Sequence, residues 1–266
     1  MKVISVCSFK GGTAKTSITL NLGASLAAQH GKRVLLIDFD AQANLTAGLG
    51  FDPDNHDSLA SVLQDKKSTD EVIVKTPIEN LDLIPADTWL ERVEVTGVLA
   101  SDRYSHEKLK KVIEKLDYDF VMIDTPPSLC WLTESALIAA THALVCATPE
   151  FYSIKGLQRL SYFMHYISER HPFELIGVVL SFWNARGKSN EGFINVVNET
   201  FPEKLLQTKI RRDIAVSEAA IHGKPVFEMR PNSRAAEDFT SLTREVLNQL
   251  SSSFTMESTC LSSTPS

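Results

Sequence analysis

Strand-length runs of Val, Ile and Leu alternate with amphipathic segments along most of the chain, and this alternation limits the folds it can adopt. The apolar runs are continuous, as expected for strands buried on both faces. They span residues 3–8, 34–38, 81–86, 120–124, 143–147 and 175–182. Segments with the three- and four-residue apolar spacing of helices lie between them, at 17–31, 106–116, 132–140 and 154–170. We therefore predict an α/β fold, a doubly wound, mostly parallel sheet with helices on both faces.

The length of 266 residues suits one large domain, which we expect at residues 1–250. Residues 251–266 are mostly Ser and Thr without periodicity, so we predict a disordered tail there. Four scattered cysteines form no Cys-x-x-Cys pair, which argues against a disulfide framework or a zinc site and favours the cytoplasm. No stretch approaches the roughly 20 apolar residues of a membrane span. The net charge of −6 argues against a surface that binds nucleic acid everywhere.

A glycine-containing loop lies between the first predicted strand and the first predicted helix. Its sequence, "FKGGTAKTS" at 9–17, departs from the common phosphate-loop pattern G-x-x-x-x-G-K-[ST] at Phe9 and Ala14. A strand, a Gly-Gly turn and Lys-Thr-Ser opening a helix nevertheless direct backbone N–H groups at phosphate oxygens. Gly11 and Gly12 would let the backbone come close to them. A turn that holds no ligand is the alternative, and the motifs below make it the weaker one.

Side chains around this loop would complete a nucleotide site. Lys15 would reach the β- and γ-phosphates, and the hydroxyl of Thr16, beside Ser17, would bind Mg²⁺. Three aspartates lie at or just past the ends of predicted strands: Asp38, Asp40 and Asp124. A carboxylate in such a position can hold Mg²⁺ through water. Any one of them could instead cap a turn, but all three together with the loop indicate a magnesium-nucleotide site.

Four segments resemble the motifs of one family. "KGGTAKTS", "DFDAQANLT", "IDTPPS" and "SEAAIHGKPV" are similar to the deviant Walker A, Walker A′, Walker B and C-terminal motifs of ParA-type partition ATPases. That class also includes MinD and the nitrogenase iron protein. The resemblance covers about residues 1–250 and is to the short, Soj-like kind. It implies a P-loop NTPase that binds ATP and Mg²⁺, hydrolyses ATP slowly, and acts in chromosome or plasmid segregation.

The resemblance also implies a role for each matched residue. Lys10 would cross a homodimer interface to the phosphates of the other subunit, so that ATP is sandwiched between two chains. Asp40 would position the attacking water, and Asp124 would be the Walker B aspartate. The implied catalytic residues are Lys10, Lys15 and Asp40, and the implied Mg²⁺ group is Thr16, Asp38 and Asp124. The implied nucleotide contacts are Gly11, Gly12, Thr13, Ala14, Lys15, Thr16, Ser17 and, for adenine, Asn184.

Ala14 departs from the family, because most members have glycine at this position. If the backbone φ there is positive, an alanine costs roughly 1–2 kcal/mol. A cost of that size could weaken ATP binding about tenfold. If the loop instead adopts ordinary dihedral angles, the methyl group is harmless. The sequence leaves both alternatives open.

Basic residues concentrate towards the C-terminus. From Lys204 to Arg234 there are seven basic and three acidic residues, so this segment carries +4 and the rest of the chain −10. That contrast, and the family's use of this region, favour a patch that binds DNA phosphates without sequence preference. An ordinary solvated face is the alternative. The candidate DNA contacts are Lys209, Arg211, Arg212, Lys224, Arg230 and Arg234.

The partner that the resemblance implies is a ParB-type centromere-binding protein that stimulates hydrolysis, and the implied location is the nucleoid. A MinD-like membrane-bound protein would need a terminal amphipathic helix, and residues 251–266 carry little apolar surface. A non-hydrolysing, nucleotide-dependent switch or scaffold stays open because of Ala14.

Overall fold

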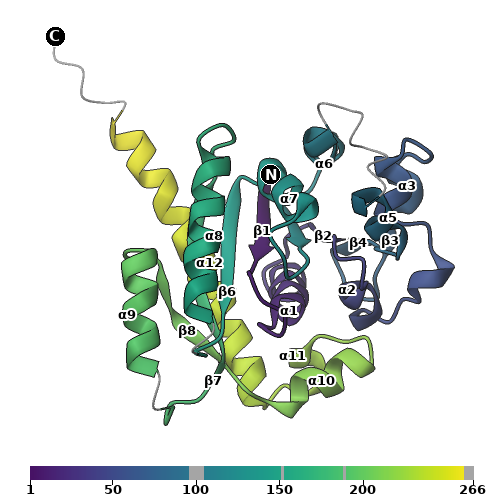
Figure 1. Cartoon of the computed structure of the whole chain (residues 1–266). Helices are drawn as coiled ribbons and strands as arrows, with labels where there is room; N and C mark the ends of the chain where they lie inside the picture. Colours follow the sequence, from purple (N-terminus) through teal and green to yellow (C-terminus); the bar gives the residue numbers. More distant parts are fainter. Residues whose placement is uncertain (96–104, 151–152, 188–189, 261–266) are drawn as a thin grey trace.

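A single sheet forms the centre of the molecule (Figure 1). The computed structural model describes residues 1–95, 105–150, 153–187 and 190–260. Within them the strand order is β3-β4-β2-β5-β1-β6-β7-β8, and only the β3–β4 pair is antiparallel. The strands are β1 (Lys2–Cys7), β2 (Val34–Asp38), β3 (Val74–Lys75), β4 (Leu81–Ile84), β5 (Phe120–Asp124), β6 (His142–Ala147), β7 (Glu174–Trp183) and β8 (Leu205–Arg211). The predicted mostly parallel sheet is confirmed.

Helices cover both faces of the sheet, as predicted. They are α1 (Lys15–Ala28), α2 (Asn44–Gly48), α3 (Leu59–Leu63), α4 (Thr69–Val72), α5 (Trp89–Val95), α6 (Lys108–Ile113), α7 (Trp131–Ala139), α8 (Ser153–Ser168), α9 (Asn190–Thr200), α10 (Ile214–Ile221), α11 (Val226–Met229) and α12 (Arg234–Cys260), with short 3₁₀ turns at Pro53–Asn55 and Ser105–Glu107. In Figure 1, α8 lies in front of the sheet and α12 behind it. None of the described helices combines the length and apolarity needed to cross a membrane.

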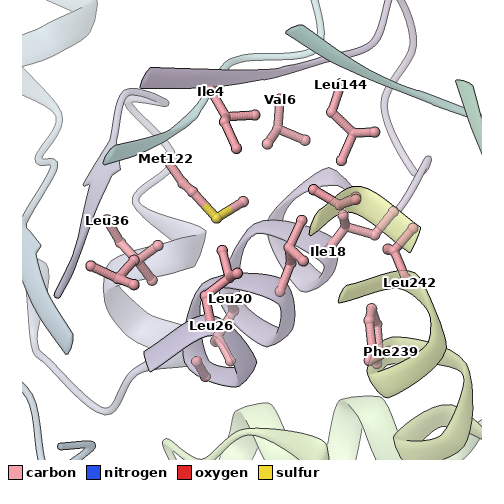
Figure 2. Close-up of a cluster of buried hydrophobic side chains, with 14 of the residues drawn as sticks. Ile4, Val6, Ile18, Leu20, Leu26, Leu36, Met122, Leu144, Phe239 and Leu242 are labelled. Carbon is pink, nitrogen blue, oxygen red and sulfur yellow. The ribbon is translucent and has the colours of Figure 1, made fainter. Parts of the chain in front are cut away.

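The alternation of side chains along β1 separates the two halves of the core. Ile4 and Val6 pack with α1 and α12, whereas Val3 and Cys7 belong to clusters on the other face. Figure 2 shows the first cluster, in which Ile18 of α1 lies beneath the β1 side chains. Burying each such aliphatic side chain contributes roughly 1.5–3 kcal/mol. This packing fixes α1, and therefore the loop that precedes it, against the C-terminal end of β1.

Two strands were not predicted from the sequence. β8 lies at one edge of the sheet and buries only Leu206 and Ile210, so it lacks the continuous apolar run of a central strand. β3 lies at the other edge and has only two residues. Edge strands contact one neighbour instead of two, and polar side chains are tolerated there.

The last helix differs from the predicted tail. α12 spans Arg234–Cys260, so residues 251–260 are helical where the sequence predicts disorder, and 261–266 lie outside the described residues. Serine fits into this helix because its hydroxyl can bond within the preceding turn. The Ser251 hydroxyl donates to the Leu247 carbonyl at 2.8 Å. The division of the chain into a domain and a tail stays a prediction.

Candidate nucleotide-binding site

The phosphate loop and two of the predicted acidic residues meet at the C-terminal edge of the sheet. β1, β5 and β2 are neighbours, and Asp38 and Asp124 occupy paired positions at the ends of β2 and β5. The Thr16 hydroxyl donates to Asp124 Oδ2 at 2.7 Å, and the Thr19 hydroxyl donates to its Oδ1 at 3.3 Å. The structure therefore brings together the loop, the predicted metal-binding hydroxyl and the two strand-end carboxylates.

Side chains from neighbouring elements hold the loop in place. The Ser8 hydroxyl donates to the Lys10 carbonyl at 2.8 Å, and the Ser181 hydroxyl of β7 donates to the Thr13 carbonyl at 2.9 Å. Lys15 opens α1 and is only 7% exposed. Its ammonium group is thus part of the site and not a mobile surface charge.

The backbone of the loop takes left-handed conformations. Gly12 has a φ of 72°, and Gly11 lies beside Pro127 of the segment after β5. Ala14 has φ 59° and ψ 24°, while its carbonyl accepts the first hydrogen bond of α1, from Ile18 N at 2.8 Å. Of the two alternatives for Ala14, the positive φ is the one observed. The methyl group therefore costs the folded chain about 1–2 kcal/mol.

The two strand-end carboxylates are fully buried. Burial, the larger effect, and the charge of Asp124 raise the pKa of Asp38 to about 7, although hydrogen bonds from Thr46 lower it. Thr46 donates to Asp38 Oδ2 from its backbone N–H at 2.8 Å and from its hydroxyl at 2.7 Å. Burial also raises the pKa of Asp124 to about 6, against the lowering effects of Thr16 and Lys15. Two buried carboxylates this close favour a cation between them.

The donor set fits Mg²⁺. The Thr16 hydroxyl and the carboxylates of Asp38 and Asp124 are hard oxygen ligands, and Mg²⁺ commonly takes one or two carboxylates and completes its shell with phosphates and water. Asp40 lies just past β2 and is 9% exposed. Its Oδ1 accepts from Gln42 N at 3.0 Å, which orients the carboxylate.

Lys10 of the phosphate loop and Asn184 lie near one groove. The Lys10 ammonium forms an ion pair with Glu150, which follows β6. Asn184 follows β7, and its Oδ1 accepts from Arg186 N at 3.1 Å. A groove of about 610 Å³ is lined by Glu150, Phe182, Trp183, Asn184, Ala185, Arg186, Arg211, Arg212 and Arg234. Its size and position beside the loop suit a nucleoside.

Three of the six predicted DNA contacts are paired with acidic residues in the structure. Arg211 Nη2 lies 2.6 Å from Asp238 and 2.7 Å from Glu237, and the Asp238 side chain is 9% exposed. Two further pairs join Arg230 to Glu218 at 3.0 Å and Arg234 to Asp213 at 3.8 Å. These pairs reduce the positive charge that the sequence count predicts for this surface.

The other three predicted DNA contacts are Lys209, Arg212 and Lys224. Lys209 lies over the Trp183 ring, with Nζ 5.3 Å from its centroid, and Arg212 lies over Phe182 at 6.0 Å. Lys224 is exposed beyond α10. Of these three, Arg212 is exposed and lines the groove, where the ring of Phe182 is itself 43% exposed.

Sequence reasoning missed the residues that support the site. Thr46 lies within "DFDAQANLT", where a hydroxyl at the start of the helix after the acidic residues could have identified it. Thr19 lies one turn beyond Lys15 on α1, so helical spacing could have found it. Ser181 and Glu150 are far from the loop in sequence and carry no local signal.

Comparison with known proteins identifies relatives over nearly the whole length. The family model described as an AAA domain matches residues 1–175. A ParA family protein of Chlamydia trachomatis is 68% identical over 249 residues, 93% of this chain and 98% of that protein. The sporulation initiation inhibitor protein Soj of Bacillus subtilis is 37% identical over 250 residues, 92% of this chain and 98% of that protein.

A solved structure supports the same assignment. The septum site-determining protein MinD of Pyrococcus horikoshii, complexed with Mg-ADP, matches with a TM-score of 0.75 at 28% identity, over 92% of this chain and 95% of that one. The similarity in sequence thus includes the loop, the acidic residues and the C-terminal segment, and the fold agrees. The chain belongs to the ParA family of P-loop proteins.

Proposed function

We propose that this protein is a partition ATPase that binds MgATP, dimerises around it, binds DNA without sequence preference and is reset by slow hydrolysis. The observation that carries the proposal is the Thr16–Asp124 hydrogen bond at 2.7 Å, beside buried Lys15 and Asp38. It joins the phosphate loop to a strand-end carboxylate in the arrangement that a magnesium nucleotide requires. The Mg-ADP bound to the related MinD supports the ligand class.

Each group in the site would have a distinct role in binding or hydrolysing ATP. Lys15, held at the start of α1, would neutralise phosphate charge, and the N–H groups of the loop would orient the phosphates. Asp40 would hold the attacking water, because it lies two residues past Asp38 and is less buried than Asp38 and Asp124. Mg²⁺, when bound through Thr16 and the buried carboxylates, would offset charge on the phosphates.

Hydrolysis would be slow in one chain alone. The Lys10 ammonium is paired with Glu150 of its own chain and would have to leave it to reach the phosphates of a second subunit. Half of the positive charge that offsets the negative charge of the transferring phosphoryl group would then arrive only in the dimer. A ParB-type partner that favours this arrangement would accelerate turnover.

The test of the enzymatic part is phosphate release from the purified protein with MgATP. We expect slow release that rises with DNA and a ParB-type protein, and Asp40→Ala should abolish the rise while leaving ATP binding intact. Lys15→Ala should abolish binding. Release by the native chain no faster than by Asp40→Ala, with ATP still bound, would instead support a non-hydrolysing switch or scaffold.

DNA binding needs variants that do not disturb the fold. Arg212 and Lys224 are exposed, whereas Arg211 is paired with a nearly buried aspartate. We expect Arg212→Glu with Lys224→Glu to abolish the retardation of arbitrary duplex DNA in the presence of ATP, and ADP to support little retardation of the native chain. Equal retardation by the charge-reversed protein would place the DNA surface elsewhere.

A further inference from the structure

Phe9, which stands where common phosphate loops have their first glycine, packs against the start of α8. A β-carbon added at Gly156 would overlap the Phe9 ring, so the ring lies directly on the helix backbone. Gly156 is buried, and Phe9 also packs against the cluster that contains Leu157 and Leu160. Glycine at this turn of α8 is therefore what allows a phenylalanine at position 9.

Lys10, which follows Phe9, contacts the connection between β6 and α8. The Lys10 side chain pairs with Glu150, at the other end of the connection from β6 to α8. The Lys10 carbonyl accepts from the hydroxyls of Ser8 at 2.8 Å and Thr13 at 3.4 Å. Both donors lie within three residues of Lys10 in the sequence, so these bonds shape the loop without attaching it to a distant element.

The two halves of the loop are attached in different ways. The second half is bonded to the sheet, by Ser181 to the Thr13 carbonyl at 2.9 Å and by Thr16 to Asp124 at 2.7 Å. In the first half, the Phe9 ring packs on α8, the Lys10 ammonium pairs with Glu150, and the Gly11 backbone lies beside Pro127. The Lys10–Glu150 pair is exposed, with side chains 36% and 57% accessible, and such pairs hold geometry weakly. Packing of Phe9 is the stronger attachment.

We propose that Phe9 is a positioning residue for the nucleotide site: its contact with Gly156 fixes the first half of the phosphate loop, and with it Lys10, relative to α8. This inference rests on the proposed function. A displaced ring would shift the backbone just before Gly11 and Gly12, whose N–H groups are to meet the phosphates. Misplacement of this kind weakens binding without removing any ligand-contacting group.

The principal test is Gly156→Ala, with Gly192→Ala as matched control. Both glycines lie on helices, but a β-carbon at Gly192 meets nothing within 4 Å. We expect Gly156→Ala to weaken the binding of a fluorescent ATP analogue with Mg²⁺ about tenfold. Gly192→Ala should bind as the native protein does. Equal affinity in all three proteins would overturn the proposal.

Removal of the ring supplies a second, independent measurement. Phe9→Ala creates no clash and should weaken binding about threefold, because the loop loses its anchor. In the Phe9→Ala background, Gly156→Ala should then have little further effect on affinity. A tenfold loss that persists without the ring would overturn the proposal, and so would a lower melting temperature with unchanged affinity, because that pattern belongs to a purely structural contact.

The native protein separates this inference from the proposed function. If it binds the ATP analogue and the variants bind equally well, only the role of Phe9 is wrong. If the native protein binds no nucleotide, the proposed function fails and the inference fails with it.

Discussion

Replacing Ala14 by glycine should stabilise the folded protein. Ala14 has φ 59° and ψ 24°, a left-handed conformation that costs a residue with a β-carbon about 1–2 kcal/mol. Glycine removes this strain but loses about 0.4–1 kcal/mol through its freer unfolded state. From the middle of each range, the net gain in the free energy of unfolding is about 0.8 kcal/mol. For a chain of this size, that corresponds to a rise in Tm of about 1–4 °C.

The assay is thermal unfolding followed by circular dichroism, without nucleotide, with Ala220→Gly as control. Ala220 lies exposed in α10 with an ordinary helical backbone, so glycine there should lower stability by about 0.5–1 kcal/mol. The affinity for ATP should change little in Ala14→Gly, because bonds from Ser181 and Ile18 on either side of Ala14 hold the loop within the protein itself. A fall in Tm like that of Ala220→Gly, or a tenfold gain in affinity without a gain in Tm, would refute this reasoning.

Three further outcomes follow from the buried charges. Burial raises the pKa of Asp38 to about 7 and that of Asp124 to about 6. Above the ordinary pKa of an aspartate, the folded chain therefore binds more protons than the unfolded chain, and the free energy of unfolding falls as pH rises through the two raised values. In EDTA, Asp38→Asn should therefore raise Tm at about pH 8 and change it little at about pH 4.5; an equal rise at both would contradict the shift. Thr46→Val removes the hydroxyl's hydrogen bond to Asp38 and the one it accepts from Ala86 N, and should cost about 2–3 kcal/mol in urea unfolding, whereas Thr46→Ser should cost little. Arg211→Ala leaves nearly buried Asp238 without its cation and should lower stability by about 3 kcal/mol in the same assay; a loss confined to DNA binding would show that the pair is not structural.

The central strands could be predicted from the sequence because strands buried on both faces appear as continuous apolar runs. Continuous apolar runs located β1, β2 and β5, and the polar residues at their ends located Asp38 and Asp124. Parallel neighbours end at the same edge, so the grouping of these residues followed from topology alone. The dihedral angles of Ala14 could not be predicted, because the same loop sequence is compatible with either conformation. The observed φ of 59° depends on bonds from residues far along the chain.

The basic segment shows a different limit of sequence reasoning. Counting charges from Lys204 to Arg234 omits Glu237 and Asp238, which lie just past its end and neutralise Arg211. On α12 these two residues face the end of β8, an edge strand without a clear apolar pattern. A pairing between an unpredicted strand and a later helix has no signature in composition. The unpaired positive charge of this surface is therefore smaller than the count predicts.

The phosphate loop lacks glycine at the two positions where common loops have it, and its attachments account for this. A glycine-rich loop can adapt to a nucleotide, whereas a loop with Phe9 and Ala14 has two side chains that resist change. Phe9 rests on Gly156, and the strained turn at Ala14 lies between the carbonyl held by Ser181 and the first bond of α1. The Gly-Gly turn lies between these two attached points, and glycine is the residue type that restricts the backbone least. Ligand binding should then order little of the loop, and most effects of substitutions at its ends should appear as changes in folding or in placement of Lys10.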